Sequence, residues 1–214
     1  MMNIKKRKAR ADQVMAVLKD RYPDSDCTLE SGKDAWKLLE MTRLAAQCTD
    51  KRVNEVSIGL FRKYPTPESM ANADIGELEE IVRPCGLYHM KAKDLRESSR
   101  QIAYEYGGRV PDTMEELLKL SGVGRKIANL ILGDIYGKPG IVSDTHCIRI
   151  SKRLGLTDTT DPRKNEEQLS EIIPVEERAV FCHRLVDFGR EICRSAHPLC
   201  DGCPFREFNC TKEK

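Results

Sequence analysis

The sequence lacks any long hydrophobic run. Of its 214 residues, 40% are hydrophobic and 33% are charged, and nowhere do roughly 18 apolar residues follow one another, as a membrane-spanning helix requires. The basic stretch at the N-terminus leads into an amphipathic segment and not into an apolar one, so we expect no secretory signal. These absences favour a soluble globular protein of the cytoplasm.

Net charge is also small. The chain has 36 Lys and Arg against 34 Asp and Glu, a formal charge of +2, which by itself does not indicate a nucleic-acid partner. The distribution is more informative, because residues 1–21 carry +5, residues 121–155 carry +4 and residues 156–192 carry −4. Two basic segments are what a phosphate-facing surface would need. A solvated charged face is the alternative for the N-terminal segment.

Alternating strand patterns, repeats and low-complexity segments are absent, whereas helical periodicity runs through the chain. The sequence therefore predicts an all-α protein with one or two domains. Turn-forming clusters separate the expected helices, which cover about 10–21, 33–47, 51–63, 74–83, 90–106, 113–120, 124–136, 145–154, 164–173 and 176–191.

The stretch 113–144 contains two expected helices joined by the turn Gly122-Val123-Gly124. Glycines expose the backbone, so a DNA strand can come close to the N–H groups that begin the second helix. The dipole of that helix favours a negative charge at the same place. We therefore predict that this turn and Arg125 bind a DNA backbone, with a plain helical hairpin as the alternative reading.

An amine and a carboxylate accompany the turn. Lys126 falls in the first turn of the second helix, where the positive end of the helix dipole is unfavourable for an ammonium ion. A neutral lysine amine is a nucleophile that can form a Schiff base. Asp144 lies eighteen positions further on and is a good N-cap for the next helix. An exposed lysine and a simple capping aspartate are the alternatives.

Four segments resemble those of a known family. Residues 120–126 read Leu-Ser-Gly-Val-Gly-Arg-Lys, residues 44–50 read Leu-Ala-Ala-Gln-Cys-Thr-Asp, residues 86–92 read Gly-Leu-Tyr-His-Met-Lys-Ala and residues 142–146 read Val-Ser-Asp-Thr-His. They resemble the corresponding segments of endonuclease III homologues, in the helix-hairpin-helix DNA glycosylase superfamily. The resemblance spans residues 33–210. Serine at position 121 stands where that family usually has proline, so we expect a turn of altered stiffness.

The resemblance implies two helical domains, residues 28–138 with the hairpin and residues 1–27 plus 139–214 with a cluster loop. It also implies base-excision repair by a bifunctional glycosylase and AP lyase acting on oxidised pyrimidines. The damaged nucleotide is flipped out of the duplex, Lys126 attacks its sugar and Asp144 assists. A polar wedge is expected at Gln47 and an apolar wedge at Leu87, both of which enter the duplex. His146 is expected to contact the DNA.

Four of the nine cysteines close the chain, with the spacing Cys193-x6-Cys200-x2-Cys203-x6-Cys210. Without a secretion signal, a four-thiolate metal site is favoured over disulfides, and free thiols are the alternative. Zinc and a [4Fe–4S] cluster both accept four cysteines. The single Cys-x2-Cys pair and the resemblance to the family's cluster loop favour [4Fe–4S], although the last gap is usually x5. Arg194, in the first gap, is expected to contact a phosphate.

Two other functions stay open at this point. One is a mismatch-specific thymine or uracil glycosylase of the same superfamily, although such relatives usually lack a lysine at position 126. The other is a non-catalytic DNA-binding module with a metal clip. The expected partner in each case is double-stranded DNA, containing damaged bases or abasic sites for the enzymes, and the resemblance implies a monomer that works near the nucleoid of a prokaryote.

Overall fold

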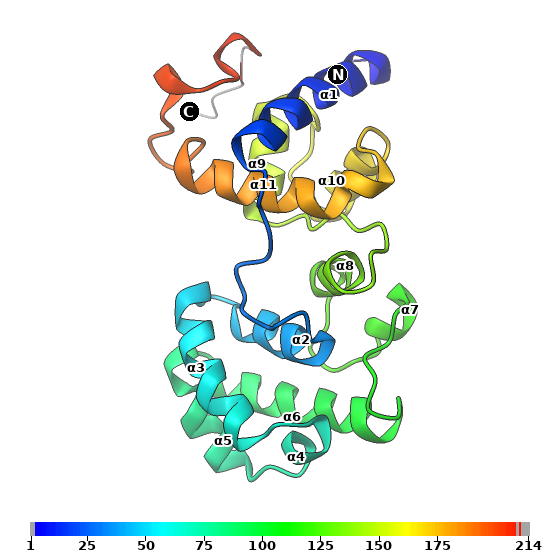
Figure 1. Ribbon diagram of the computed structural model, residues 1–214, viewed down its shortest axis with the longest axis vertical. Coiled ribbons are helices and arrows are strands. Elements are labelled where there is room, and N and C mark those ends of the chain that lie inside the picture. Colours follow the sequence, from blue (N-terminus) through cyan, green and yellow to red (C-terminus); the bar gives the residue numbers. More distant parts are fainter. Residues whose placement is uncertain (1–2, 209, 211–214) are drawn as a thin grey trace. The chain divides into compact units, whose positions relative to one another are not determined.

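A computed structural model describes residues 3–208 and 210. The chain divides into two compact units, each described here by itself. Residues 27–138 form the hairpin unit, and residues 1–26 with 139–214 form the cysteine unit. The described residues contain helices and no strand (Figure 1), so the all-α prediction is confirmed. The domain limits expected from the sequence, residues 28–138 and residues 1–27 plus 139–214, concern parts that fold independently, and they stay a prediction.

The hairpin unit is built from the helices α2 to α8. Their bounds are α2 Ala35–Leu44, α3 Asp50–Lys63, α4 Pro67–Ala71, α5 Ile75–Val82, the 3-10 turn η1 Arg83–Cys85, α6 Tyr88–Tyr104, α7 Met114–Leu117 and α8 Arg125–Asp134. Helix α6 is central, since α2, α4 and α5 all pack against it, and α2 also packs against α8. Buried Leu38, Leu78, Leu95 and Ile131 belong to this core.

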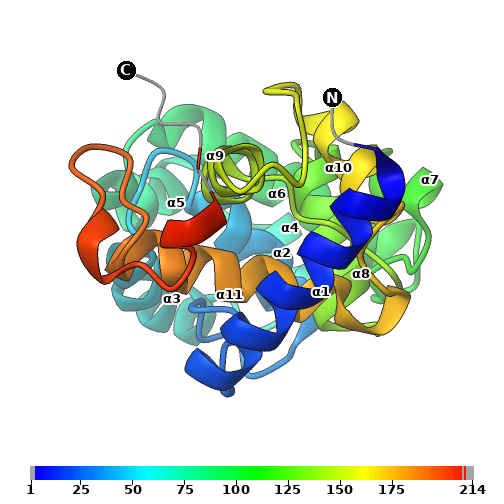
Figure 2. The same ribbon diagram turned by 90° about the horizontal axis from the view of Figure 1, so that it is seen from above.

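The cysteine unit combines the N-terminal helix with the C-terminal third of the chain. Its elements are α1 Ile4–Arg21, α9 Thr145–Arg153, α10 Pro162–Ser170, η2 Val175–Glu177, α11 Arg178–Glu191, η3 Cys200–Gly202 and η4 Arg206–Phe208. Helix α11 packs against both α1 and α9 (Figures 1 and 2). The segment after residue 193 is anchored by Phe205, whose fully buried ring meets Phe188 edge-on at 5.3 Å between centroids.

Two helices differ from the sequence prediction. Helix α1 begins at Ile4 and not near residue 10, because Asn3 caps it and buried Arg7 donates from Nε to Leu156 O at 2.8 Å. A charged stretch with no apolar stripe gives no periodic signal for such a contact. Helix α4 was missed because two prolines, at 65 and 67, indicated a turn. Proline is well tolerated at the first helical position, and a Thr66–Ser69 capping box completes the start of this helix.

The described helices include none that is both long and apolar enough to cross a membrane.

Candidate functional site

Helix α8 begins without a side-chain cap. Its N-cap residue is Gly124, whereas Asp34, Thr49, Asp74 and Thr113 cap other helices of the hairpin unit by accepting a bond from a backbone N–H. A helix start that lacks such a cap offers backbone N–H groups and a positive dipole end to an external anion. This arrangement suits the DNA-backbone contact that the sequence predicts at the turn.

Side chains of α6 hold the turn before α8. The Ser121 amide donates to Oε1 of Gln101 at 2.8 Å, and the Ser121 hydroxyl donates to Oδ1 of Asp94 at 3.1 Å. A proline at this position could form neither bond, because it has no N–H and no hydroxyl. Serine in place of the usual proline therefore replaces a rigid ring with two hydrogen bonds. Sequence reasoning missed Asp94 and Gln101, which lie 27 and 20 residues away.

The two glycines of the turn serve different needs. Gly122 has a φ of +68°, and a Cβ there would come within 3.0 Å of the Asp94 carboxylate. Gly124 has ordinary extended backbone angles (φ −97°, ψ 172°), and a Cβ there would meet nothing within 4 Å. Nothing inside the hairpin unit thus requires glycine at 124. Its bare backbone is an advantage only toward something outside the protein.

The residues that follow the turn face outward to different degrees. Arg125 and Lys126 are exposed, whereas the Val123 side chain is buried and its N–H donates to Leu120 O at 3.1 Å. The outward groups of this segment are therefore the glycine backbone and two basic side chains.

In the cysteine unit, Asp144 caps α9 as the sequence predicts. Its Oδ1 accepts a bond from the Cys147 N–H at 2.7 Å. Among the residues that the structure describes, its second oxygen has no hydrogen-bond partner. The carboxylate is half-buried. It is thus fixed through one oxygen and offers the other for chemistry.

His146 depends on a glycine from a neighbouring helix. A Cβ built at Gly189, in α11, would overlap Nδ1 of His146 and come within 3.0 Å of the Arg149 guanidinium. Nη2 of Arg149 lies 3.1 Å from Nδ1 of His146 and donates to Cys193 O at 2.9 Å. Gly189 therefore makes room for the imidazole and for a link to the first cysteine of the loop. A lone glycine inside a helix is only a weak signal of close approach, so sequence reasoning missed it.

Both expected wedge residues adopt left-handed backbone conformations. Gln47 lies between α2 and α3 with a φ of 55°, and Leu87 precedes α6 with a φ of 50°. Gln47 is exposed, and Leu87 exposes 46% of its surface. Both residues stand at helix ends in the hairpin unit, the geometry that a projecting wedge needs.

Helix α9 and an aromatic anchor hold the cysteine loop, residues 193–210. Arg153 donates to the carbonyls of Arg194 (2.8 Å) and Ser195 (3.2 Å), and its Nη1 lies 3.5 Å from Sγ of Cys193. Arg194 itself is exposed. The same helix that Asp144 caps thus supports the start of the loop.

Beneath the hairpin lies a buried polar network between α2 and α6. Glu40 accepts from the hydroxyl of Ser98 at 2.8 Å, and Nη1 of Arg43 donates to Asp94 O at 2.7 Å. Burial raises the pKa of Glu40 to about 7, although Arg43, Ser98 and Ser99 all act in the opposite direction. The network connects α2 to Asp94, which in turn holds the turn.

The comparison with known families agrees with this geometry. A family model described as "HhH-GPD superfamily base excision DNA repair protein" matches residues 41–175. The chain is also 41% identical over 198 residues to Endonuclease III of Synechocystis sp., covering 92% of this chain and 90% of that protein. The chain belongs to the HhH-GPD superfamily. Within it, the chain is an endonuclease III homologue.

Solved structures of this superfamily match as well. A non-covalent Endonuclease III–DNA complex has a TM-score of 0.90 and 36% identity, covering 98% of this chain and 96% of that one. A trapped Endonuclease III–DNA covalent intermediate matches with the same TM-score and identity, covering 97% and 96%. Among the sequence relatives, a thymine-DNA glycosylase of Aeropyrum pernix is 34% identical over 194 residues, covering 87% of this chain and 86% of that protein.

The four loop cysteines of this HhH-GPD chain could serve as ligands of a metal group. All four are half-buried free thiols, and those of Cys193, Cys203 and Cys210 pack against the core of the cysteine unit. Within the described residues, no three of the sulfurs lie within 4.8 Å of one another. The donor set is four thiols, which both zinc and an iron–sulfur cluster accept.

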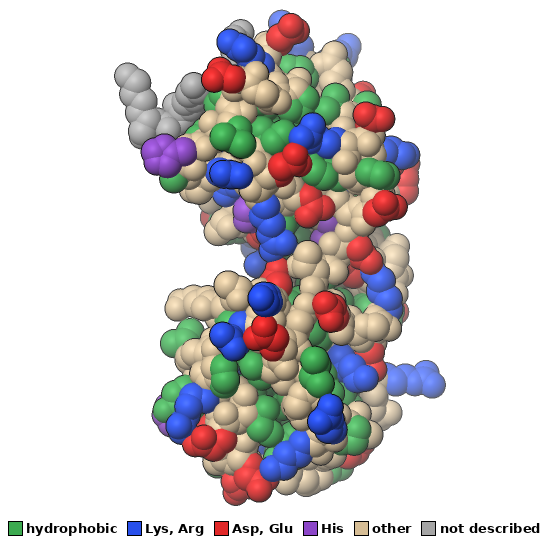
Figure 3. All heavy atoms as spheres, turned by 60° about the vertical axis from the view of Figure 1, so that its left-hand side comes forward, with side chains coloured by type: hydrophobic (Ala, Val, Ile, Leu, Met, Phe, Trp, Pro, Cys, Tyr) green, Lys and Arg blue, Asp and Glu red, His purple; other side chains and the backbone are tan. Residues whose placement is uncertain are grey.

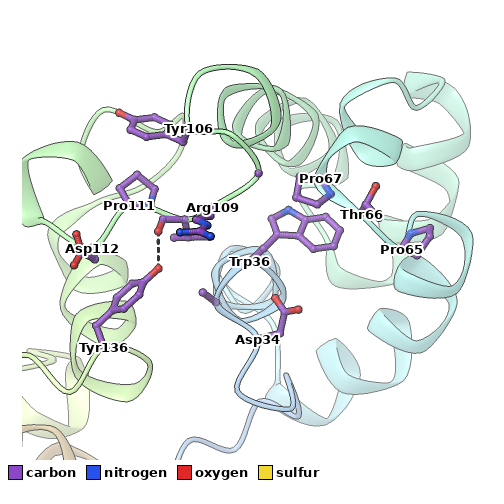
Figure 4. A pocket seen from close by; sticks show the side chains of 13 residues that line it. Asp34, Trp36, Pro65, Thr66, Pro67, Tyr106, Arg109, Pro111, Asp112 and Tyr136 are labelled. Carbon is purple, nitrogen blue, oxygen red and sulfur yellow. Dashed lines mark hydrogen bonds between the residues drawn. The ribbon is translucent and has the colours of Figure 1, made fainter.

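Two further surface features lie apart from the predicted site. A cavity of about 720 Å³ in the hairpin unit is lined by Trp36, Tyr106, Arg109 and Tyr136, among others, and by none of the predicted site residues (Figure 4). On the face drawn in Figure 3, basic and acidic side chains are interspersed in both units. That face therefore shows charges of both signs and no field of one sign.

Proposed function

We propose that this chain is a bifunctional DNA glycosylase and AP lyase that removes oxidised pyrimidines from double-stranded DNA. The observation that carries the proposal is the start of α8, where exposed Lys126 follows a Gly124 N-cap that has no side chain. The chain is 36% identical to an endonuclease III that was trapped covalently on DNA. An amine beside a phosphate-binding helix start suits that chemistry.

In the proposed reaction, the neutral amine of Lys126 attacks C1′ of the flipped nucleotide. The N-glycosidic bond breaks as the new C–N bond forms, and the base leaves with the bonding electron pair and takes up a proton. Ring opening gives an imine, and loss of a proton from C2′ expels the 3′ phosphate by β-elimination. Asp144, held by Cys147 N–H through one oxygen, accepts a proton from the amine and offsets positive charge on the sugar.

The same proposal assigns the DNA contacts. The backbone of Gly122 and Gly124, with the Arg125 side chain, binds phosphates of the damaged strand, while Val123, whose own N–H donates to Leu120 O, holds the turn between the two glycines. Gln47 and Leu87 fill the space that the flipped nucleotide leaves, because both project from helix ends with exposed side chains. On the cysteine unit, His146 and Arg194 contact the DNA.

A [4Fe–4S] cluster held by the loop cysteines completes the proposal. The ligands are Cys193, Cys200, Cys203 and Cys210, and the single Cys-x2-Cys pair together with the similarity to endonuclease III supports this choice over zinc. Four protein ligands leave no open coordination position, so the group supplies a structural crosslink. Arg153, whose Nη1 lies 3.5 Å from the sulfur of Cys193, is placed to stabilise a ligand thiolate.

Borohydride reduction tests the enzyme assignment directly. Incubation with a duplex that contains an abasic site should give a stable protein–DNA adduct, and Lys126→Ala should give none. Lys119→Ala is the matched control, since Lys119 is an exposed lysine on the other side of the turn, and it should trap like the wild type. Asp144→Asn, which keeps a capping oxygen, should slow trapping by about 10²-fold or more. Absence of any wild-type adduct would refute the lyase.

A second candidate function is mismatch repair, favoured by the 34% identity to the thymine-DNA glycosylase of Aeropyrum pernix. Duplexes that contain thymine glycol, a G·T mismatch or a G·U mismatch separate the two. The oxidised-pyrimidine proposal requires excision of thymine glycol at the highest rate. Faster excision from G·T or G·U would assign the chain to mismatch repair.

A further inference from the structure

The two expected wedge residues share a structural problem. Gln47 (φ 55°) and Leu87 (φ 50°) both hold left-handed backbone conformations that side chains other than glycine rarely adopt. Such conformations persist only where the surrounding structure fixes them. Each residue stands in a short connection, Gln47 just after α2 and Leu87 between η1 and α6. Something must therefore hold both connections in place.

Lys91 meets both connections with a single ammonium group. Its Nζ donates to Leu44 O at 2.9 Å, to Ala46 O at 2.8 Å and to Cys85 O at 2.8 Å. Leu44 is the last residue of α2, and Ala46 directly precedes Gln47. Cys85 ends η1, two residues before Leu87. One side chain from the first turn of α6 thus ties the backbone of both wedge connections to one point.

The burial of Lys91 shows that this arrangement is specific. It is 4% exposed and is the one buried lysine among residues 3–208 and 210. Its partners are three main-chain carbonyls, and within that part of the chain it forms no ion pair. Burial lowers the pKa of Lys91. Three convergent carbonyls, two of them at the negative end of α2, compensate for the missing water and counter-charge.

We propose that Lys91 is a positioning residue for the glycosylase, which holds the Gln47 and Leu87 connections at a fixed separation so that both side chains enter the duplex together. The inference rests on the proposed function. An ammonium group can aim three donors at three carbonyls around one point, which a planar guanidinium or an apolar side chain cannot do. Lys91 acts through the two wedges and touches neither the sugar nor the base.

The test compares borohydride trapping on abasic duplex with trapping on abasic single strand. A single strand has no stacked partner to displace, so it requires Lys126 but not the wedges. A general loss of folded enzyme lowers both rates equally, whereas loss of wedge positioning lowers only the duplex rate. The duplex-to-single-strand ratio is therefore the readout that a merely structural role would leave unchanged.

We expect Lys91→Met to lower this ratio by about tenfold or more and Lys91→Arg to lower it by an intermediate factor. Ser99→Ala is the matched control, because it also removes buried polar bonds between α6 and α2: the Ser99 hydroxyl accepts from Trp36 Nε1 at 3.0 Å and donates to Glu40 Oε1 at 3.3 Å. It should leave the ratio within about twofold of wild type. In a Gln47→Ala/Leu87→Ala background, Lys91→Met should have little further effect, since its action passes through those side chains.

Each outcome decides a different point. If wild type traps neither DNA, the proposed function fails. If Gln47→Ala and Leu87→Ala leave the ratio unchanged, the wedge assignment fails, and the positioning role of Lys91 fails with it. If those variants lower the ratio but a folded Lys91→Met or Lys91→Arg does not, the Lys91 proposal alone is overturned. Should Lys91→Met not fold, Lys91→Arg decides by the same ratio.

Discussion

The hairpin turn and the cysteine loop are stabilised in opposite ways. The turn is held by hydrogen bonds within its own unit, which Ser121 donates to the side chains of Gln101 and Asp94. The loop is held at its start by Arg153 and near its end by the buried ring of Phe205, and its four cysteines form no disulfide bond. The turn is thus held by polar bonds of its own, whereas the loop is held at its two ends and is the segment that the proposed cluster would crosslink.

This difference separates two tasks of a DNA-binding protein. Because the turn is already ordered, binding a phosphate costs no ordering entropy there. The hydrogen bonds that the turn donates to the phosphate therefore contribute directly to affinity. The proposed cluster would couple the order of the loop to the supply of the cofactor. Three predictions test the contrast, from the largest expected effect to the smallest.

Loss of a cysteine ligand should disorder the loop and leave the turn intact. In Cys203→Ala we expect amide protection over residues 193–210 to fall by about a hundredfold, equivalent to about 3 kcal/mol, because the crosslink is lost. Amides of residues 120–126 should keep their protection. Hydrogen–deuterium exchange measures both regions, and visible absorbance reports the cluster. Cys27→Ala, outside the loop, is the control. Equal loss of protection in both regions would contradict the contrast.

Adding a methyl group at Gly124 should weaken DNA binding without weakening the fold. Its backbone angles suit any residue and nothing lies within 4 Å of the added Cβ, so stability should change by less than about 0.5 kcal/mol. DNA affinity should fall about tenfold, since the methyl group separates backbone from phosphate. Gly59→Ala, equally open but within α3, should stabilise by about 0.5–1 kcal/mol and leave affinity unchanged. Unaltered affinity in Gly124→Ala would remove the turn from the interface.

The polar support beneath the turn should make stability depend on pH. The pKa of Glu40 is raised by burial from 4.5 to about 7, so the folded state binds a proton more tightly than the unfolded chain. This contribution to stability is complete below about pH 4.5 and is lost as pH rises through about 7. Urea midpoints of wild type should therefore decline relative to Glu40→Gln across that window. A constant difference between the two proteins would show that Glu40 is ionised throughout.

Short sequence patterns predicted those parts of the site that a few adjacent residues determine. Glycines two positions apart, a lysine directly after them and an aspartate before the next helix are readable because helix starts and caps are decided by a few adjacent residues. The structure places a helix start at Gly124 and a capping bond at Asp144, as those patterns predict. The all-α class followed in the same way from periodicity.

The supports of the site were not readable, because they come from distant positions. Lys91 reaches a carbonyl 47 residues away, and Asp94 reaches a hydroxyl 27 residues away. Helical periodicity does not distinguish either from solvent-exposed polar neighbours, and although Lys91 belongs to the family-like segment 86–92, that segment does not show which carbonyls it meets. Gly189 is similar, because its missing side chain matters only to His146 on another helix. Packing between helices, and not their individual patterns, selects these residues.

Serine at position 121 also has a consequence for how the molecule recovers from unfolding. An X–Pro bond in a denatured chain populates both isomers and returns to trans over tens to hundreds of seconds. With serine, residues 120–124 avoid that delay, and the turn can reform as soon as α6 supplies Asp94 and Gln101 as its hydrogen-bond partners. Serine at position 121 thus removes one slow isomerisation from the refolding of this turn.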